Sequence, residues 1–416
     1  MSERILTLRQ QKEVRNKWLS GRLESLIPSL MARSGLDMWL VICREYNEDP
    51  VMMSLLPQPA LSARRRTILV FARGEDGTVE RFGVSRYPIP GFYETVWQPE
   101  QESQHACLAR VIAERDPQRI GLNRSTTFAF ADGLSDTEHD QLIDALPPRY
   151  RARLVSAEEM AVGWLERRSE AELAAYPHIV RMGHDLIRRA FSHEVVHPGI
   201  TTTEDVVWWM RQEMQRIGVA AWFQPTVMIQ ARDQWFGRFL NRSDLRTVIQ
   251  PGDLLHCDVG FTYLGLTTDQ QQHAYVLRPG ESAAPDGIRR ALQTGNRVQD
   301  IHMEEMEIGR TGNEVLAAVL QRCRAEQIDA MIYSHPLGNH GHAAGPTIGL
   351  WDRQDGVPGA GDYPLYDRTC YSIELNITQT IPEWDNAPAR IMLEEDAVLD
   401  GKMGWLDGRQ TELHLI

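Results

Sequence analysis

The sequence predicts an α+β protein in two parts, and three kinds of pattern support this. Short apolar runs at residues 38–43 and 67–72 are bounded by polar or turn residues, as buried strands are. Ser135, Ser169 and Thr311 are each followed three positions later by Glu, which is typical of helix starts. In the second half, single charged residues interrupt apolar, strand-like stretches. Burying such a charge is costly unless it is paired or binds a metal.

The first part, residues 1–162, alternates helical and strand-like segments, beginning with a helix over residues 8–34. This pattern predicts a smaller α/β domain. No catalytic residue types cluster there, so we expect it to cover the active site, restrict substrate size or form a subunit contact. In the second part, residues 163–416, long helices alternate with strands that carry the charged residues.

Composition narrows the possible partners and compartment. The formal net charge of -13 argues against nucleic acid or an anionic membrane as a partner, because both are bound by basic surfaces. There is no apolar signal core at the N-terminus and no run long enough to span a bilayer. The five cysteines are widely spaced among apolar neighbours, as reduced residues of a cytoplasmic protein are. We therefore expect a cytoplasmic protein.

Several charged residues in the second part form a candidate metal site. Four carboxylates and one imidazole can hold two divalent cations that share a bridging hydroxide, a nucleophile for hydrolysis. Oxygen-rich sites of this kind suit manganese, our first expectation, and also cobalt, zinc or iron. Each residue also has a plain alternative, such as an aspartate capping a turn or a glutamate facing solvent, and Glu394 competes with its neighbour. The proposed ligands are Asp258, Asp269, His342, Glu374 and Glu395.

At these residues the chain resembles the pita-bread metallopeptidases, which include methionine aminopeptidase, aminopeptidase P and prolidase, with creatinase as a relative that lacks metal. The segment PGDLLHCDVGFTYLGLTTD at 251–269 is similar to the family's pattern of two aspartates eleven positions apart. The resemblance covers residues 165–416 and implies a pita-bread catalytic domain, while the first part resembles the creatinase-type N-terminal domain. It implies the five ligands above, Glu374 as proton shuttle and a homodimer.

The sequence departs from the family where histidines usually contact the substrate. Gly338 stands four residues before the proposed metal histidine, Gly349 and Trp351 follow it, and Asn241 precedes the first aspartate. Gln271 stands where the family has threonine. The metal site therefore resembles the family more closely than the substrate site does.

Other side chains are candidates for the missing roles. If residues 338–342 are extended, His340 shares a face with His342 and is a candidate catalytic residue; a hydrogen bond within the loop is the alternative. His335, Trp351 and Phe223 are candidate substrate-binding residues, with structural roles as the alternatives. His256 shares a strand face with Asp258 and is a candidate for orienting ligands.

We therefore expect a metal-dependent hydrolase, an Xaa-Pro aminopeptidase or dipeptidase of the bacterial type, that cleaves small peptides by means of a metal-bridging hydroxide. Loss of the usual substrate histidines leaves a second hypothesis open, in which the same centre hydrolyses a non-peptide amide or amidine. A third hypothesis is a binding scaffold that has lost catalysis.

Overall fold

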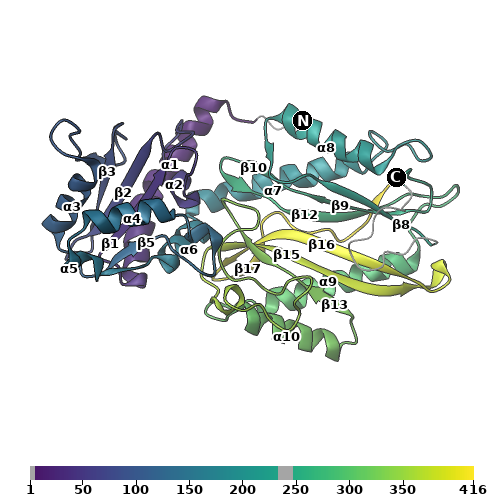
Figure 1. Cartoon of the computed structure of the whole chain (residues 1–416). Coiled ribbons are helices and arrows are strands. Elements are labelled where there is room, and N and C mark those ends of the chain that lie inside the picture. The colour runs from purple at the N-terminus through teal and green to yellow at the C-terminus, as the bar shows by residue number, and fades with distance from the viewer. Residues whose placement is uncertain (1–4, 233–246) are drawn as a thin grey trace. The chain divides into compact units, whose positions relative to one another are not determined.

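The computed structural model describes residues 5–232 and 247–416. Its contacts divide the chain into two compact units, one of which is Leu6–Ser169, while Glu170–Ile416 forms most of the other. The boundary predicted after residue 162 lies inside helix α6 (Glu158–Glu166). The predicted α+β class is confirmed by the mixture of helices and sheets in the two units (Figure 1).

The first unit contains a six-stranded sheet in the order β4-β3-β2-β1-β5-β6. Strands β1, β5 and β6 are parallel, whereas β2 runs antiparallel to both β1 and β3. The two predicted apolar runs are β1 and β2, and both are buried except at their ends. The strands are β1 (Met38–Arg44), β2 (Arg66–Arg73), β3 (Val79–Ser85), β4 (Glu94–Thr95), β5 (Ile120–Leu122) and β6 (Leu154–Ser156).

Helices accompany this sheet, and the predicted helix over residues 8–34 is confirmed as α1 (Leu8–Ser34). Its N-terminus has a capping box between Thr7 and Gln10, and it ends at Gly35, which has a left-handed φ of 63°. Ser135 caps α4 by accepting a hydrogen bond from the amide of Glu138, as predicted. The other helices are α2 (Pro50–Leu55), α3 (Gln104–Arg115), α4 (Asp136–Ala145) and α5 (Pro148–Arg151).

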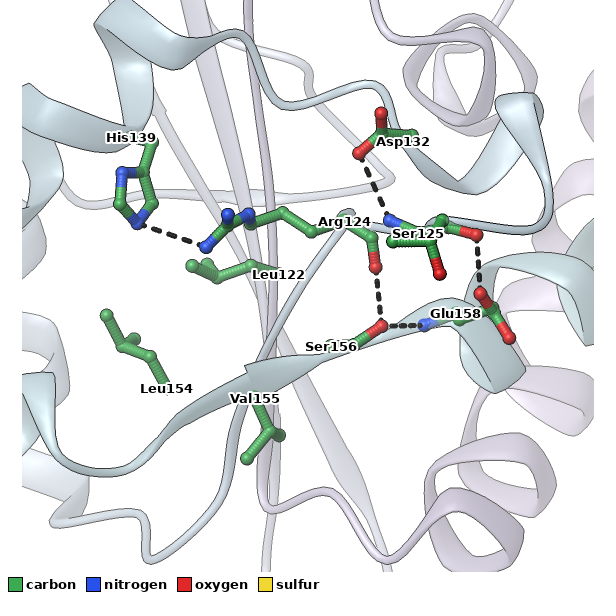
Figure 2. Close-up of a pocket in the computed structure, with 10 residues that line it drawn as sticks. Leu122, Arg124, Ser125, Asp132, His139, Leu154, Val155, Ser156 and Glu158 are labelled. Atoms are coloured by element: carbon green, nitrogen blue, oxygen red, sulfur yellow. Dashed lines mark hydrogen bonds between the residues drawn. The ribbon is translucent and has the colours of Figure 1, made fainter.

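A cavity of about 630 Å³ lies where the parallel strands β5 and β6 end, and Figure 2 shows its lining. Its polar groups largely satisfy one another. Ser125 donates its amide to Asp132 and its hydroxyl to Glu158, and a nitrogen of Arg124 lies 3.4 Å from His139 Nε2. None of the residues proposed from the sequence lines this cavity.

The second unit is built on a nine-stranded sheet whose main path runs β13-β15-β16-β12-β9-β8. Strand β14 pairs with β15, β17 pairs with β16, and β18 pairs with β12, while β7, β10 and β11 form a separate small sheet. The strands are β7 (Ala220–Ala221), β8 (Thr226–Gln230), β9 (Leu254–Val259), β10 (Phe261–Tyr263), β11 (Leu266–Thr267), β12 (Gln270–Tyr275), β13 (Ala330–Ile332), β14 (His335–Leu337), β15 (Thr369–Ile381), β16 (Ala387–Asp400), β17 (Lys402–Trp405) and β18 (His414–Leu415).

Four long helices accompany this sheet. Figure 1 shows α7 and α8 next to the half of the sheet that contains β9 and β12, and α9 and α10 next to the half that contains β15. Ile373 and Leu393 pack with α9 and α10 residues in one buried apolar cluster. On that same face of β16, Glu395 meets His184 of α7. Both helix pairs thus cover one face of the sheet. The helices are α7 (Glu170–Ala190), α8 (Thr203–Ile217), α9 (Asp286–Glu305) and α10 (Gly312–Ala325).

Thr311 and Glu314 form the predicted capping box at the start of α10. Val206, Met210 and Met214 are buried on α8, which ends at Gly218. No helix among the described residues is both long and apolar enough to cross a membrane.

His302 of α9 predicts a specific sensitivity to acid. Its side chain is completely buried, and burial lowers the pKa of its imidazole to about 3. Below pH 6.5 this histidine is therefore protonated in the unfolded chain but stays neutral in the folded chain. Each further pH unit of acidification then lowers the unfolding free energy by about 1.4 kcal/mol. Between pH 7 and pH 5, His302→Gln should lose about 2 kcal/mol less than the wild type. Urea unfolding at both pH values measures this, and equal losses would contradict the assignment.

Candidate metal centre

A row of polar side chains crosses four neighbouring strands on one face of the large sheet. Gln271 of β12 lies opposite Asp258 of β9 on one side and opposite Glu394 of β16 on the other. Glu394 in turn lies opposite Glu374 of β15. Residues directly opposite one another in a ladder share a face, so all four side chains project from the same side of the sheet. This side is opposite to the one covered by the helices.

Asp269 and His335 join this row from segments next to it. Asp269 precedes Gln271 by two positions, so the two residues share a face. His335 of β14 lies opposite Ser372, which precedes Glu374 by two positions on β15. The register of the sheet therefore brings an imidazole to the same carboxylates.

Three overlapping groups of side chains have ligand atoms within 4.8 Å of one another. Asp269 and Glu394 each belong to two of these groups, as does His335. The groups are Asp258 with Asp269 and Glu394, Asp269 with His335 and His342, and His335 with Glu374 and Glu394.

The hydrogen bonding of the His335 ring is that expected of a metal ligand. Its Nδ1 lies 3.1 Å from the carbonyl oxygen of Pro336, which can only accept, so Nδ1 carries the hydrogen. Its Nε2 makes no hydrogen bond to any described residue. A neutral ring would therefore point a lone pair at carboxylates. Ligating histidines usually make such a bond to a carbonyl through their other nitrogen.

The distances at His335 also fit a shared ion. Nε2 lies 3.6 Å from an oxygen of Asp269, 3.9 Å from one of Glu374 and 3.5 Å from one of Glu394. These separations are too long for hydrogen bonds. Two ligand atoms that each lie about 2.1 Å from one ion are about 3.4 Å apart in a tetrahedron. The donor set is therefore spaced as ligands of a divalent cation are.

The electrostatics of the group also favour a bound cation. Burial raises the pKa of Asp269 well above its usual range, and the charges of Glu394, Asp258 and Glu374 raise it further. Burial, followed by the charges of Glu394 and Asp258, likewise raises the pKa of Glu374. So many buried carboxylates repel one another, and divalent cations between them would remove this repulsion.

Four of the five ligands proposed from the sequence, Asp258, Asp269, His342 and Glu374, take part in these groups. Glu395 does not, and Glu394 takes part instead. The reason is strand alternation: Glu394 lies opposite Glu374, whereas Glu395 lies opposite Ile373 on the helix-covered face.

Glu395 has its own partners on the helix-covered face. Its oxygens accept hydrogen bonds from Gln272 Nε2 at 2.7 Å and from the amide of Gln410 at 2.9 Å, and lie 2.7 Å from His184 Nε2. Burial lowers the pKa of His184, but hydrogen bonds and charges from Glu395 and Asp407 outweigh this and raise it to about 9. A protonated His184 therefore balances Glu395, and no metal is needed there.

Aromatic residues pack against the segments that carry two of these ligands. The ring centroid of Trp222 lies 5.2 Å from that of His342 and 4.4 Å from that of Phe223. A Cβ atom at Gly260 or Gly341 would lie within 2.3 Å of Trp222, so only glycine lets the ring approach the backbone. Phe223, a predicted substrate-binding residue, thus lies beside the centre. Trp222 was missed because aromatic residues in such a cluster more often build core.

The other candidates lie in different places. Residues 338–342 form bends instead of an extended strand, so the alternation that would align His340 with His342 does not apply. His340 belongs to none of the three groups. Trp351 lies in a turn and is 47% exposed. His335, proposed for substrate binding, lies among the possible ligands, and Asn241 falls outside the described residues.

Solved structures with the same fold cover nearly the whole chain. The X-Pro aminopeptidase from Thermotoga maritima MSB8 matches with a TM-score of 0.64 and 15% identity, over 92% of this chain and 98% of that one. The dipeptidase PepE from Mycobacterium ulcerans matches with a TM-score of 0.63 and 18% identity, over 96% and 98%. The Xaa-Pro dipeptidase from Bacillus anthracis matches with a TM-score of 0.62 and 14% identity, over 96% and 100%.

At the level of sequence, no curated protein matches the chain. The model of metallopeptidase family M24, however, matches residues 175–400, which is more than half of the 416 residues. This range contains all the side chains of the three groups. The family uses divalent metal ions and acts on peptides. The chain therefore belongs to metallopeptidase family M24 and is a metal-dependent, peptidase-type hydrolase.

Proposed function

We propose that the chain holds two divalent metal ions, with manganese as the first choice and cobalt, zinc or iron as the others. Asp258, Asp269 and Glu394 would hold one ion, and His335, Glu374 and Glu394 the other. His342 lies beside Asp269 and His335 and would complete the set. The observation that carries this proposal is that Glu394 belongs to both of these groups, as a bridging carboxylate does.

We further propose that the substrate is a small peptide with proline in the second position, cleaved by an aminopeptidase or a dipeptidase reaction. The names of the matched structures support this choice. Bound divalent ions would activate a water molecule as hydroxide and polarise the scissile carbonyl. Glu374 would accept the proton of that water and deliver it to the leaving nitrogen. Trp222 and Phe223 would limit access from one side.

A second candidate is hydrolysis of a non-peptide amide or amidine at the same metals. The departures at Gly338, Gly349 and Trp351 favour it, because histidines that usually handle the peptide are absent there. The homodimer and the cytoplasmic location expected from the sequence remain predictions.

The ligand assignment predicts opposite results for two neighbouring glutamates. Glu394→Gln removes a carboxylate shared by two groups, so metal affinity should fall by about 10–100-fold or more. Glu395→Gln should keep the metal but lose about 3 kcal/mol of unfolding free energy, because it leaves His184 with fewer partners. Metal content after dialysis and urea unfolding measure both effects. Metal loss in Glu395→Gln alone would contradict the assignment.

The proposed activity is tested with paired substrates. The metal-loaded wild type should cleave Xaa-Pro peptides much faster than matched Xaa-Ala peptides, because proline recognition is the proposed specificity. Asp258→Ala should abolish both metal binding and cleavage, since it removes one ligand from the first group. Selective hydrolysis of small amides or amidines, with Xaa-Pro peptides left intact, would support the second candidate instead.

A further inference from the structure

Gln271 occupies the place in the row between two proposed ligands. Its side chain lies on β12 between Asp258 and Glu394, and only 4% of the residue is exposed. It does not belong to any of the three groups of possible ligands. A buried amide among carboxylates must nevertheless satisfy its own donors and acceptor.

The amide of Gln271 makes three contacts that fix its orientation. Its Nε2 donates to Oε1 of Glu374 at 2.5 Å and to Oε2 of Glu394 at 2.7 Å. Its Oε1 lies 2.9 Å from Nε2 of His256, which donates to it. Ionised carboxylates only accept hydrogen bonds, so the NH₂ group must face them and the oxygen must face His256. Both hydrogens of the amide are used.

These contacts use one oxygen of Glu374 and one of Glu394, and the second oxygen of each lies nearer to His335. Gln271 takes Oε1 of Glu374 and Oε2 of Glu394. The other oxygens, Oε2 of Glu374 and Oε1 of Glu394, are the ones that lie 3.9 Å and 3.5 Å from His335 Nε2. The amide therefore turns one oxygen of each glutamate toward the imidazole, where the ligand atoms of His335, Glu374 and Glu394 converge.

We propose that Gln271 is a positioning residue that sets the affinity of the ion position formed by His335, Glu374 and Glu394. This inference rests on the proposed pair of metal ions. Opposed carboxylates on neighbouring strands repel each other, and the bridging amide holds them in the ligating orientation before an ion binds. A flipped amide would point its oxygen at two carboxylates and its NH₂ group at the donating Nε2 of His256, so these contacts together hold one orientation.

The test is titration of the metal-free, full-length protein with cobalt(II), followed by visible absorption and equilibrium dialysis. Gln271→Met keeps the size of the side chain and removes its donors. The wild type should bind two equivalents, and in the variant one of them should bind about 10–100-fold less tightly with an altered cobalt spectrum. His256→Phe, which removes the donor to Gln271, should weaken the same equivalent.

Gln272→Met is the matched control, because Gln272 is the next residue on the same strand and is also buried. Its amide contacts Glu395 and His414 on the other face, so its loss should lower the unfolding midpoint and leave cobalt binding unchanged. A wild type that binds two equivalents, with unchanged affinity and spectrum in both Gln271→Met and His256→Phe, would overturn the role of Gln271 alone. A wild type that binds fewer than two equivalents would overturn the two-ion proposal, and this inference with it.

Discussion

The alternation of side chains along β-strands is the constraint on which this molecule's chemistry depends. The pairing of β9, β12, β16 and β15 aligns Asp258, Gln271, Glu394 and Glu374 in one row on the face away from the helices. On β15 and β16, intervening positions such as Ile373 and Leu393 form part of the apolar core with α9 and α10. One register therefore builds a hydrophobic core on one side and a polyanionic site on the other.

The polyanionic side is unfavourable by itself, and the protein contains polar groups that reduce this cost. Gln271 donates to two of the carboxylates, and the amide of Asp269 lies 3.2 Å from an oxygen of Asp396. The pKa of Asp396 is nevertheless raised well above its usual range by burial and by the charge of Glu394. These groups orient the acids, and bound cations would reduce the repulsion between them.

Much of this organisation was readable from the sequence. Local signals predicted α1 and the caps of α4 and α10, because propensity and capping act over a few residues. The choice between Glu394 and Glu395 required the register between β15 and β16, which no local pattern carries. The position of His335 likewise depends on its pairing opposite Ser372, a residue that lies far along the chain from it. Contacts set by strand pairing between distant segments were the part that sequence reasoning missed.

The long hairpin of β15 and β16 limits where the chain can change in length. Its two strands pair without interruption from Thr369 opposite Leu399 to Ile381 opposite Ala387. An insertion in the short connection, which includes a 3₁₀ turn at Pro382–Trp384, would leave this pairing intact. One added or deleted residue between Ala387 and Glu394 would instead exchange the two faces of β16 beyond it, exposing Leu393 to the acids and turning Glu394 toward the core. Length variation among relatives should therefore collect at the hairpin tip and be excluded from the strand beside it.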